Sequence, residues 1–372
     1  MISVEPIAVL VVDDSVVVRR IVTSLLSEDP DIRVAGTAAS GRSALEKIEQ
    51  IRPDILTLDL EMPEMDGLET LRHLRRLHPR LPVIMFSTLA ERAAAATLEA
   101  LSLGARDYVT KPATVGSPDA ALEIVRSQLI PKIKALVPRG CRTLEAARTV
   151  RSARPALSGA RPPRTDPHGI LAIGSSTGGP DALARIVPEL PADLPVPVVI
   201  AQHMPPIFTG LFAQRLDRVS KLTVVEGQPG MRLEPGLLVV APGDCHLLVV
   251  EEHGVLRVAT NQEARQNGCR PAVDVLFRSV ATVFGARVLA CVLTGMGQDG
   301  LRGSEQLRAR GAEIVIQDEP TSVVWGMPGA IATAGLADRI LPLPAIAADL
   351  TDALRRSGGA PPSSRLGARA IS

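Results

Sequence analysis

The sequence predicts two α/β domains, each built on a doubly wound sheet that is parallel or mostly parallel. With 372 residues, the chain is too long for one ordinary hydrophobic core. Short apolar runs alternate with segments whose apolar residues recur at helical spacing, which is typical of α/β folds. This alternation occurs twice, before and after a stretch rich in Arg, Ala, Pro and Ser.

In the first domain, assigned to residues 1–126, strands and helices alternate regularly. Apolar runs predict strands at residues 7–12, 32–37, 54–60, 81–87 and 106–110. Helical spacing, as in Leu68, Leu71 and Leu74, predicts helices at residues 16–26, 41–51, 66–78, 93–105 and 119–136. The order favours a parallel sheet with helices on both faces.

Residues 127–167 are assigned to the end of the last helix and to a linker rich in Arg, Pro and Ser. An arginine-rich arm that binds nucleic acid is the alternative, but no helix-turn-helix pattern follows it. The second domain is assigned to residues 168–356, and residues 357–372 to a disordered tail. Its predicted strands are 170–174, 196–202, 237–242, 246–250, 288–295 and 313–318, with helices at 180–190, 210–219, 274–285 and 300–311.

The composition narrows the class of protein. The chain is 46% hydrophobic with a formal net charge of +1, which gives no reason to expect nucleic-acid binding. Aromatic residues make up 2%, so platforms that stack bases or sugars are not expected. The four cysteines lack CxxC spacing, which favours a reducing compartment over a disulfide framework. Without an apolar run of about 18 residues, we expect a cytoplasmic protein that meets membranes only through a partner.

Carboxylates gather at the strand ends of the first domain. Asp13 and Asp14 end its first strand, and Asp59 ends its third. Because carboxyl ends of parallel strands meet in one crevice, these groups would repel one another unless a hard cation such as Mg²⁺ lay between them. A carboxylate beside Mg²⁺ can accept a phosphoryl group. Lys111 and Ser87, at the ends of later strands, would contact the phosphoryl oxygens.

The segments "VVDDS", "LDLEMPEMDG" and "YVTKP" resemble the receiver domain of two-component response regulators. The resemblance implies a flavodoxin-like fold and phosphorylation of Asp59 by a CheA-type histidine kinase. It also implies Mg²⁺ held by Asp13, Asp14 and Asp59, together with the backbone carbonyl of Glu61. Tyr108 stands where receivers often place a switching aromatic, although an ordinary half-buried tyrosine is a comparable interpretation.

The second domain opens with "ILAIGSSTGGPDAL", which contains a glycine-rich corner after a strand. A Walker phosphate loop would need a lysine that is absent, and a dinucleotide fingerprint would need different glycine spacing. A plain turn leaves the hydroxyl residues between the glycines unexplained. A serine nucleophile accounts for them, because a strand-to-helix corner exposes its Oγ beside free N–H groups of the helix N-terminus.

A nucleophilic serine needs a base and an acid that orients the base. His203 directly follows the apolar run "VPVVIAQ", whereas His246 fits a structural histidine. Asp299 lies in the glycine-rich loop "TGMGQDG" after another strand. Serine, histidine and aspartate therefore each follow a strand of one sheet. Their order along the chain differs from that of α/β-hydrolases.

The segments "AIGSSTGGPDAL", "AQHMPPIFTGLFAQRLD", "VVAPGDCHLLV", "VLTGMGQDG" and "QDEPTSVVWGMPGAI" resemble the catalytic domain of CheB protein-glutamate methylesterases. The resemblance implies a Rossmann-like three-layer domain in which Ser176 is the nucleophile, His203 the base and Asp299 the orienting acid. It also implies that the Met296 backbone N–H stabilises the oxyanion, with Thr177 nearby.

Some positions depart from the pattern of that family. Ser175 stands where the family commonly has Ala, and Ala272 replaces a frequent Ser in "RPAVDVLF", which puts a hydroxyl role there in doubt. Arg270 has two interpretations, as a contact for acidic groups of the substrate or as an ordinary surface arginine.

The resemblance implies hydrolysis of glutamate γ-methyl esters, and deamidation of selected glutamines, on cytoplasmic helices of methyl-accepting chemoreceptors. It implies no cofactor for hydrolysis and no nucleic-acid partner. We further expect the unphosphorylated receiver to cover the catalytic crevice and phosphorylation of Asp59 to release it. The alternative is a phospho-switched binding protein with a decayed hydrolase domain, in a two-component pathway with a non-chemotaxis output.

Overall fold

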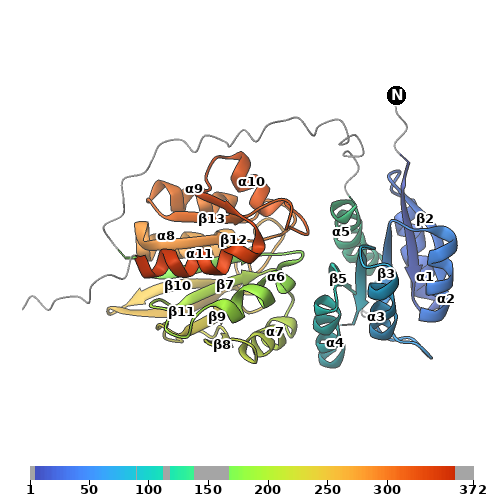
Figure 1. The fold of residues 1–372 in the computed structure, drawn as a ribbon, viewed down its shortest axis with the longest axis horizontal. Coiled ribbons are helices and arrows are strands. Elements are labelled where there is room, and N and C mark those ends of the chain that lie inside the picture. Colours follow the sequence, from blue (N-terminus) through green and yellow to red (C-terminus); the bar gives the residue numbers. More distant parts are fainter. Residues whose placement is uncertain (1–4, 89, 112–117, 138–166, 357–372) are drawn as a thin grey trace, which may run out of the picture.

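The computed structural model describes residues 5–88, 90–111, 118–137 and 167–356. Within these residues the chain forms two α/β units, one at each end of the molecule (Figure 1). Most of the predicted linker and the predicted tail lie outside the described residues. The predicted fold class, two parallel α/β sheets, is confirmed.

The N-terminal unit is a five-stranded parallel sheet with strand order β2-β1-β3-β4-β5. This order is that of flavodoxin-like folds. Its strands are β1 (Ile7–Val12), β2 (Ile32–Ala38), β3 (Ile55–Asp59), β4 (Val83–Ser87) and β5 (Asp107–Thr110). Its helices are α1 (Val16–Ser27), α2 (Gly41–Ile51), α3 (Gly67–Leu77), α4 (Glu91–Ser102) and α5 (Pro118–Leu136), and α5 continues beyond the predicted domain end at residue 126.

Local sequence accounts for where these helices begin. Ser15, Ser40 and Asp66 are N-cap residues whose side chains accept hydrogen bonds from backbone N–H groups of the first turns of α1, α2 and α3. Every residue of β1, β3 and β4 is buried, as expected for strands covered on both faces. The polar strand ends are thereby held at one edge of the sheet.

The C-terminal unit is a seven-stranded parallel sheet with strand order β14-β13-β12-β6-β7-β9-β8. Its strands are β6 (Ile170–Ser175), β7 (Val198–Gln202), β8 (Thr223–Glu226), β9 (Leu237–Val240), β12 (Val288–Val292), β13 (Glu313–Gln317) and β14 (Arg339–Leu341). Its helices are α6 (Gly179–Ile186), α7 (Phe208–Asp217), α8 (Val273–Phe284), α9 (Leu301–Ala309), α10 (Met327–Thr333) and α11 (Leu343–Arg356).

Two apolar clusters make this unit a three-layer structure. Residues of α6, α7 and α11 pack on one face of the sheet, and residues of α8, α9 and α10 pack on the other. The first cluster continues into the N-terminal unit, so the two units share apolar contacts. β12, β6 and β7 are adjacent, and their carboxyl ends place three loops side by side.

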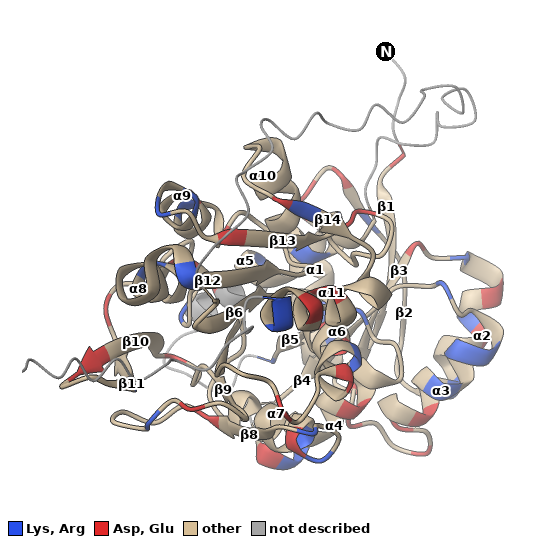
Figure 2. Cartoon of the chain, turned by 60° about the vertical axis from the view of Figure 1, so that its left-hand side comes forward, with Lys and Arg blue, Asp and Glu red and all other residues tan. Residues whose placement is uncertain are grey.

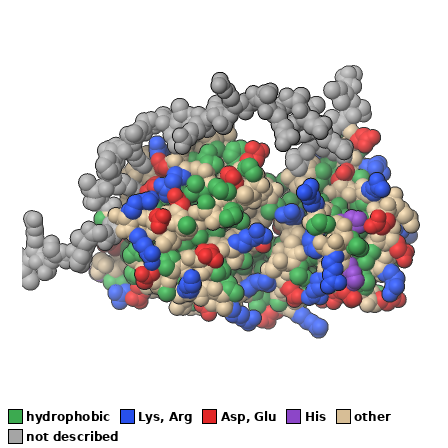
Figure 3. Space-filling view, in the orientation of Figure 1, with side chains coloured by type: hydrophobic (Ala, Val, Ile, Leu, Met, Phe, Trp, Pro, Cys, Tyr) green, Lys and Arg blue, Asp and Glu red, His purple; other side chains and the backbone are tan. Residues whose placement is uncertain are grey.

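The strand predicted at residues 246–250 is confirmed, but it lies outside the seven-stranded sheet. The predicted strand 246–250 is part of β10 (His246–Glu252), which pairs with β11 (Val255–Asn261) in a separate antiparallel hairpin. The two-residue turn contains His253 and Gly254, both with positive φ. Lys and Arg residues are interspersed with Asp and Glu residues over the helices (Figure 2), and side chains of both charges lie on the face shown in Figure 3. In the described part of the chain, no helix has the length and apolarity needed to cross a membrane.

Candidate active site

Ser176 lies at the corner between β6 and α6, where the sequence placed a nucleophile. Its backbone N–H donates to the Thr294 carbonyl at 3.1 Å, and its carbonyl accepts from the Gly179 N–H at 2.7 Å. Gly178, with φ +79°, allows the chain to turn into α6. In the described part of the chain, Ser176 Oγ makes no hydrogen bond, so it is free to meet a substrate carbonyl.

His203 follows directly after β7, beside this corner. Its N–H donates to the Ser175 carbonyl at 3.2 Å, which continues the pairing of β6 with β7. Its Nε2 lies 2.7 Å from Asp299 Oδ2, and its Nδ1 lies 3.3 Å from Cys269 Sγ. The structure therefore joins His203 to Asp299 through Nε2. The other ring nitrogen, Nδ1, which could accept a proton from Ser176, contacts the Cys269 thiol.

Asp299 is 1% exposed and is held on both carboxylate oxygens. Besides the His203 ring, it accepts from the backbone N–H groups of Val273, Asp274 and Gly300 and from Asn267 Nδ2, at 2.7–3.0 Å. Burial alone would raise the pKa of Asp299, but the hydrogen bonds from His203 and the backbone lower it. The carboxylate therefore stays charged and fixes the orientation of the histidine.

A second buried carboxylate, Asp274, lies next to Asp299. Burial and the charge of Asp299 raise the pKa of Asp274. Asn267 Nδ2 donates to Asp274 Oδ2 and to Asp299 Oδ1, both at 2.9 Å. One amide group thus bridges the two carboxylates and offsets their repulsion.

The surroundings of His203 favour its charged form. Burial opposes the charge, but hydrogen bonds to Asp299 and Cys269 outweigh it and raise the pKa of His203 to about 10. An imidazole acts as a base only when it is neutral. In this arrangement the contact with Cys269 therefore works against proton transfer from Ser176.

Met296, the predicted oxyanion donor, lies in the loop after β12. Gly295 is held by its neighbours: its N–H donates to the Val324 carbonyl at 3.0 Å, and its carbonyl accepts from the Met327 N–H at 2.8 Å. Met296 follows and lines the same cavity as Ser176. Among the described residues, no acceptor is recorded for the Met296 N–H, so this donor is available to a substrate oxygen.

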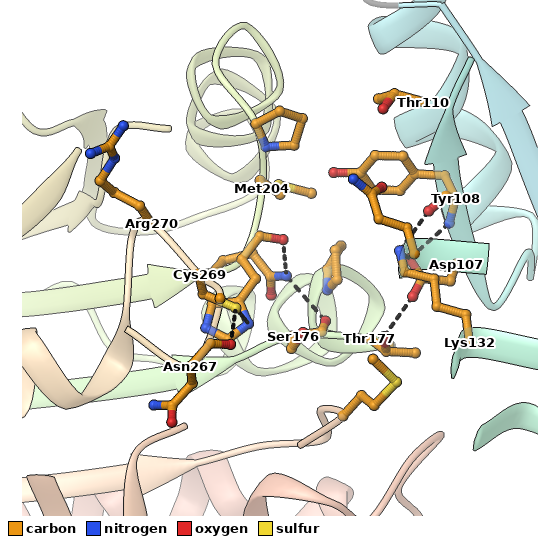
Figure 4. A pocket seen from close by; sticks show the side chains of 18 of the residues that line it. Asp107, Tyr108, Thr110, Lys132, Ser176, Thr177, Met204, Asn267, Cys269 and Arg270 are labelled. Atoms are coloured by element: carbon orange, nitrogen blue, oxygen red, sulfur yellow. Dashed lines mark hydrogen bonds and ion pairs between the residues drawn. The ribbon is translucent and has the colours of Figure 1, made fainter. Parts of the chain in front are cut away.

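These groups line a cavity of about 830 Å³ between the two units. Ser176, Thr177 and Cys269 lie on its catalytic side, and Asp107 and Tyr108 face them from β5 of the N-terminal unit (Figure 4). A volume of this size holds a side chain or a short peptide segment.

Two contacts join the units at this cavity. In the first, Thr177 Oγ1 donates to Asp107 Oδ2 at 2.5 Å (Figure 4). Within the N-terminal unit, the other oxygen of this carboxylate, Oδ1, pairs with Lys132 Nζ at 3.0 Å. The rings of Tyr108 and Phe208 stack with centroids 4.8 Å apart and planes inclined by 3°. The residue next to Ser176 is therefore bonded directly to the N-terminal unit.

The second site lies at the carboxyl ends of β1 and β3. Asp13, Asp14 and Asp59 each bring a carboxylate oxygen within 4.8 Å of the others. Lys111 Nζ lies 2.9 Å from Asp13 Oδ2 and 2.6 Å from Asp59 Oδ2. Burial, with the neighbouring charge of Asp13, raises the pKa of Asp59 to about 6 despite Lys111. Three close carboxylates form an oxygen donor set that suits Mg²⁺.

Glu61 and Ser87, also predicted for this site, lie close to it. The Glu61 N–H donates to Asp59 Oδ1 at 3.3 Å. The Ser87 hydroxyl is buried, accepts from Thr97 Oγ1 at 2.7 Å and donates to the backbone carbonyls of Thr88 and Ala93. Ser87 would have to exchange these partners to contact a phosphoryl group on Asp59.

Family models match both units. Residues 9–123 match the response regulator receiver domain, and residues 171–350 match the CheB methylesterase domain. The chain is 55% identical over 341 residues to a protein-glutamate methylesterase/protein-glutamine glutaminase of Nocardioides sp., covering 91% of this chain and 92% of the relative. The chain belongs to the CheB methylesterase family.

Further relatives carry the same name. The chain is 48% identical over 355 residues to the protein-glutamate methylesterase/protein-glutamine glutaminase of Trichodesmium erythraeum, covering 94% of this chain and 99% of the relative. A solved structure, the CheB methylesterase catalytic domain of Thermotoga maritima, is 40% identical with a TM-score of 0.49, covering 50% of this chain and 98% of that one.

In this CheB-family chain, the structure gathers most of the predicted catalytic residues. Ser176, His203 and Met296 line one cavity, and Asp299 contacts His203, but no Ser176–His203 hydrogen bond is recorded in the described part of the chain. His246 is a buried structural histidine, as predicted: its Nδ1 accepts from the Ala272 N–H and its Nε2 faces the Ala264 carbonyl.

Arg270, which had two interpretations, lines the cavity and is bonded to other groups of this chain. Its guanidinium donates to Asp244 Oδ1 and to the carbonyls of Gln262 and Glu263. With these acceptors it holds the rim of the cavity. Arg265, whose side chain is 54% exposed, is the more accessible cation there.

Sequence reasoning missed several residues that act around the site. Gln202, Cys269, Asn267 and Asp107 carry no motif of their own, and three of them contact Ser176, His203 or Asp299 only through folding. Gln202 alone had a visible signal, because it is a polar residue at the end of a strand that is otherwise apolar.

Proposed function

We propose that this protein hydrolyses glutamate γ-methyl esters, and deamidates selected glutamines, on the cytoplasmic helices of methyl-accepting chemoreceptors, through Ser176, His203 and Asp299. The observation that carries the proposal is the short His203–Asp299 contact at a cavity that also contains Ser176 Oγ and the Met296 N–H. The names of its relatives, protein-glutamate methylesterase/protein-glutamine glutaminase, support the choice of substrate.

Both reactions are acyl transfers. Because Nε2 of His203 is held by Asp299, Nδ1 is the nitrogen left to take the serine proton, and it must first leave Cys269. Ser176 Oγ then attacks the side-chain carbonyl, and the Met296 N–H donates to the oxyanion. His203 passes the proton to the departing methanol or ammonia, and water, deprotonated by His203, releases the acyl group as glutamate.

We propose that the receiver controls this chemistry by covering the cavity. Thr177 adjoins the nucleophile, and its bond to Asp107 together with the Tyr108–Phe208 stack would keep a receptor helix out. Phosphorylation of Asp59 by a CheA-type kinase would release these contacts. Mg²⁺ held by Asp13, Asp14 and Asp59, with the Glu61 carbonyl, would neutralise negative charge during phosphoryl transfer.

The proposed division of the chain follows the same assignment. Residues 1–126 form the receiver, 127–167 the end of α5 and the linker, 168–356 the methylesterase domain and 357–372 the tail. The family-model matches at 9–123 and 171–350 lie within the proposed domains.

Methanol release from methylated receptor membranes tests the function. Wild type, Ser176→Ala and Asp59→Asn are compared with and without a small phosphodonor. We expect release to vanish in Ser176→Ala and to be stimulated by the phosphodonor only where Asp59 is intact. Absence of release from every form, with a related methylesterase as positive control, would favour a binding protein whose hydrolase domain has decayed.

A further inference from the structure

Behind the catalytic corner lies a buried polar network that the mechanism above does not use. Ser175 is fully buried at the end of β6, and Gln202, 2% exposed, ends β7 opposite it. The Ser175 hydroxyl donates to Gln202 Oε1 at 2.6 Å. The other end of the amide, Nε2, donates to the carbonyls of Ser176 and His203 at 3.1 and 3.2 Å.

The amide of Gln202 thus joins the peptide of the nucleophile to the peptide of the base. Carbonyl oxygens only accept hydrogen bonds, so the amide must point its Nε2 toward both of them. Its Oε1 is then left buried, and the Ser175 hydroxyl satisfies it. Ser175 therefore favours the one amide orientation in which Gln202 can hold the two catalytic residues.

Gly179 leaves the space that this arrangement requires. A Cβ at Gly179 would lie 2.1 Å from Gln202 Oε1 and 2.8 Å from Ser175 Cβ. A larger residue there would displace the amide. The Gly179 N–H also donates to the Ser176 carbonyl at 2.7 Å, so that oxygen is held from two sides.

We propose that Ser175 and Gln202 are positioning residues for the esterase reaction, which set the distance and angle between Ser176 and His203. The inference rests on the proposed function, because it assigns the same nucleophile and base. Ser175 acts through Gln202, and Gln202 acts through the two carbonyls. Displacement of a reacting group by about 1 Å can cost roughly 100-fold in rate.

The test is a double-mutant cycle read by the rate at which a fluorophosphonate probe labels Ser176 in the full chain, with a phosphodonor present. We expect Ser175→Ala to slow labelling ~3–10-fold, the value of one neutral hydrogen bond, and Gln202→Met to slow it by roughly 100-fold. In the Gln202→Met background, Ser175→Ala should add less than about twofold, because its partner is gone.

Methanol release supplies the second measurement, and we expect Ser175→Ala to lower kcat with KM unchanged. Ser304→Ala is the matched control: this serine in α9 is also buried, and within the described residues its hydroxyl has no partner. It should label at the wild-type rate. Thermal melting of each variant, followed by circular dichroism, separates loss of folded protein from loss of reactivity.

The outcomes are distinguishable. If wild type is not labelled at Ser176, the proposed function fails. If wild type is labelled but folded Ser175→Ala is labelled equally fast, the positioning role is overturned. It is also overturned if the decreases in labelling rate of Ser175→Ala and Gln202→Met multiply in the double variant. A rise in KM without a change in kcat would also contradict it, because a positioning role predicts a lower kcat.

Discussion

Removing the carboxylate of Asp107 should activate the unphosphorylated protein. Asp107 receives a hydrogen bond from Thr177 across the boundary between the receiver and the catalytic unit. Its other partners, Lys132 and the Tyr108 N–H, belong to the receiver itself. Losing those contacts affects the covered and the open forms alike, so the difference between the forms reports mainly the bond to Thr177.

The size of the effect follows from that one bond. A hydrogen bond to a charged group contributes about 1.5–3 kcal/mol, and Thr177 is only 4% exposed in the covered form. Asp107→Ala should therefore shift the equilibrium toward the open form ~10–100-fold, until activity reaches the phosphorylated level. Asp107→Asn can keep a neutral hydrogen bond, so its increase should be smaller, about 2–10-fold.

The assay is methanol release from methylated receptor membranes without phosphodonor, with the ranking Asp107→Ala above Asp107→Asn above wild type. With phosphodonor, the three proteins should be equally active. Asp31→Ala is the control, because it also removes a carboxylate bound to a lysine, Lys134, but lies before β2 at the opposite edge of the receiver sheet. Unphosphorylated Asp107→Ala activity within twofold of wild type would refute the role of this bond.

Two further predictions concern pH and metal. Because the contact with Cys269 helps raise the pKa of His203 to about 10 and only neutral imidazole is a base, Cys269→Ala should move the rise of kcat/KM with pH to lower pH. At pH 7.5 we expect an increase of ~3–10-fold, and an unchanged pH profile would contradict the argument. Chelation of Mg²⁺ should abolish phosphorylation of Asp59 by a small phosphodonor, measured as a phosphate-dependent mobility shift, and added Mg²⁺ should restore it.

The sequence predicted the parallel sheets well because their signal is local. The buried strands β1, β3, β6 and β7 are mostly apolar, and polar residues stand at or directly after their ends. Short edge strands such as β14, with three residues, carry too little pattern to be predicted. The strands of the β10–β11 hairpin are only partly buried, and their sequence gives no sign of which sheet they join.

The environment of the base was beyond sequence reasoning. Cys269 is 66 residues from His203 in the chain, and Asn267 is 32 residues from Asp299. Nothing in a lone cysteine or asparagine indicates such a partner. The same holds for Asp107, which is 70 residues from Thr177 and becomes part of the site only through the packing of two domains.

Strand β5 lies between the proposed phosphorylation site at Asp59 and the candidate active site at Ser176. At its start, Asp107 and Tyr108 contact Thr177 and Phe208 of the catalytic unit. Directly after its end, Lys111 pairs with Asp59. A phosphoryl group on Asp59 would add negative charge beside Lys111, so the same short strand bears both the change in charge and the contacts that cover the active site. The proposed coupling would need no long chain of intermediates, because Asp107 and Lys111 lie at the two ends of the same short strand.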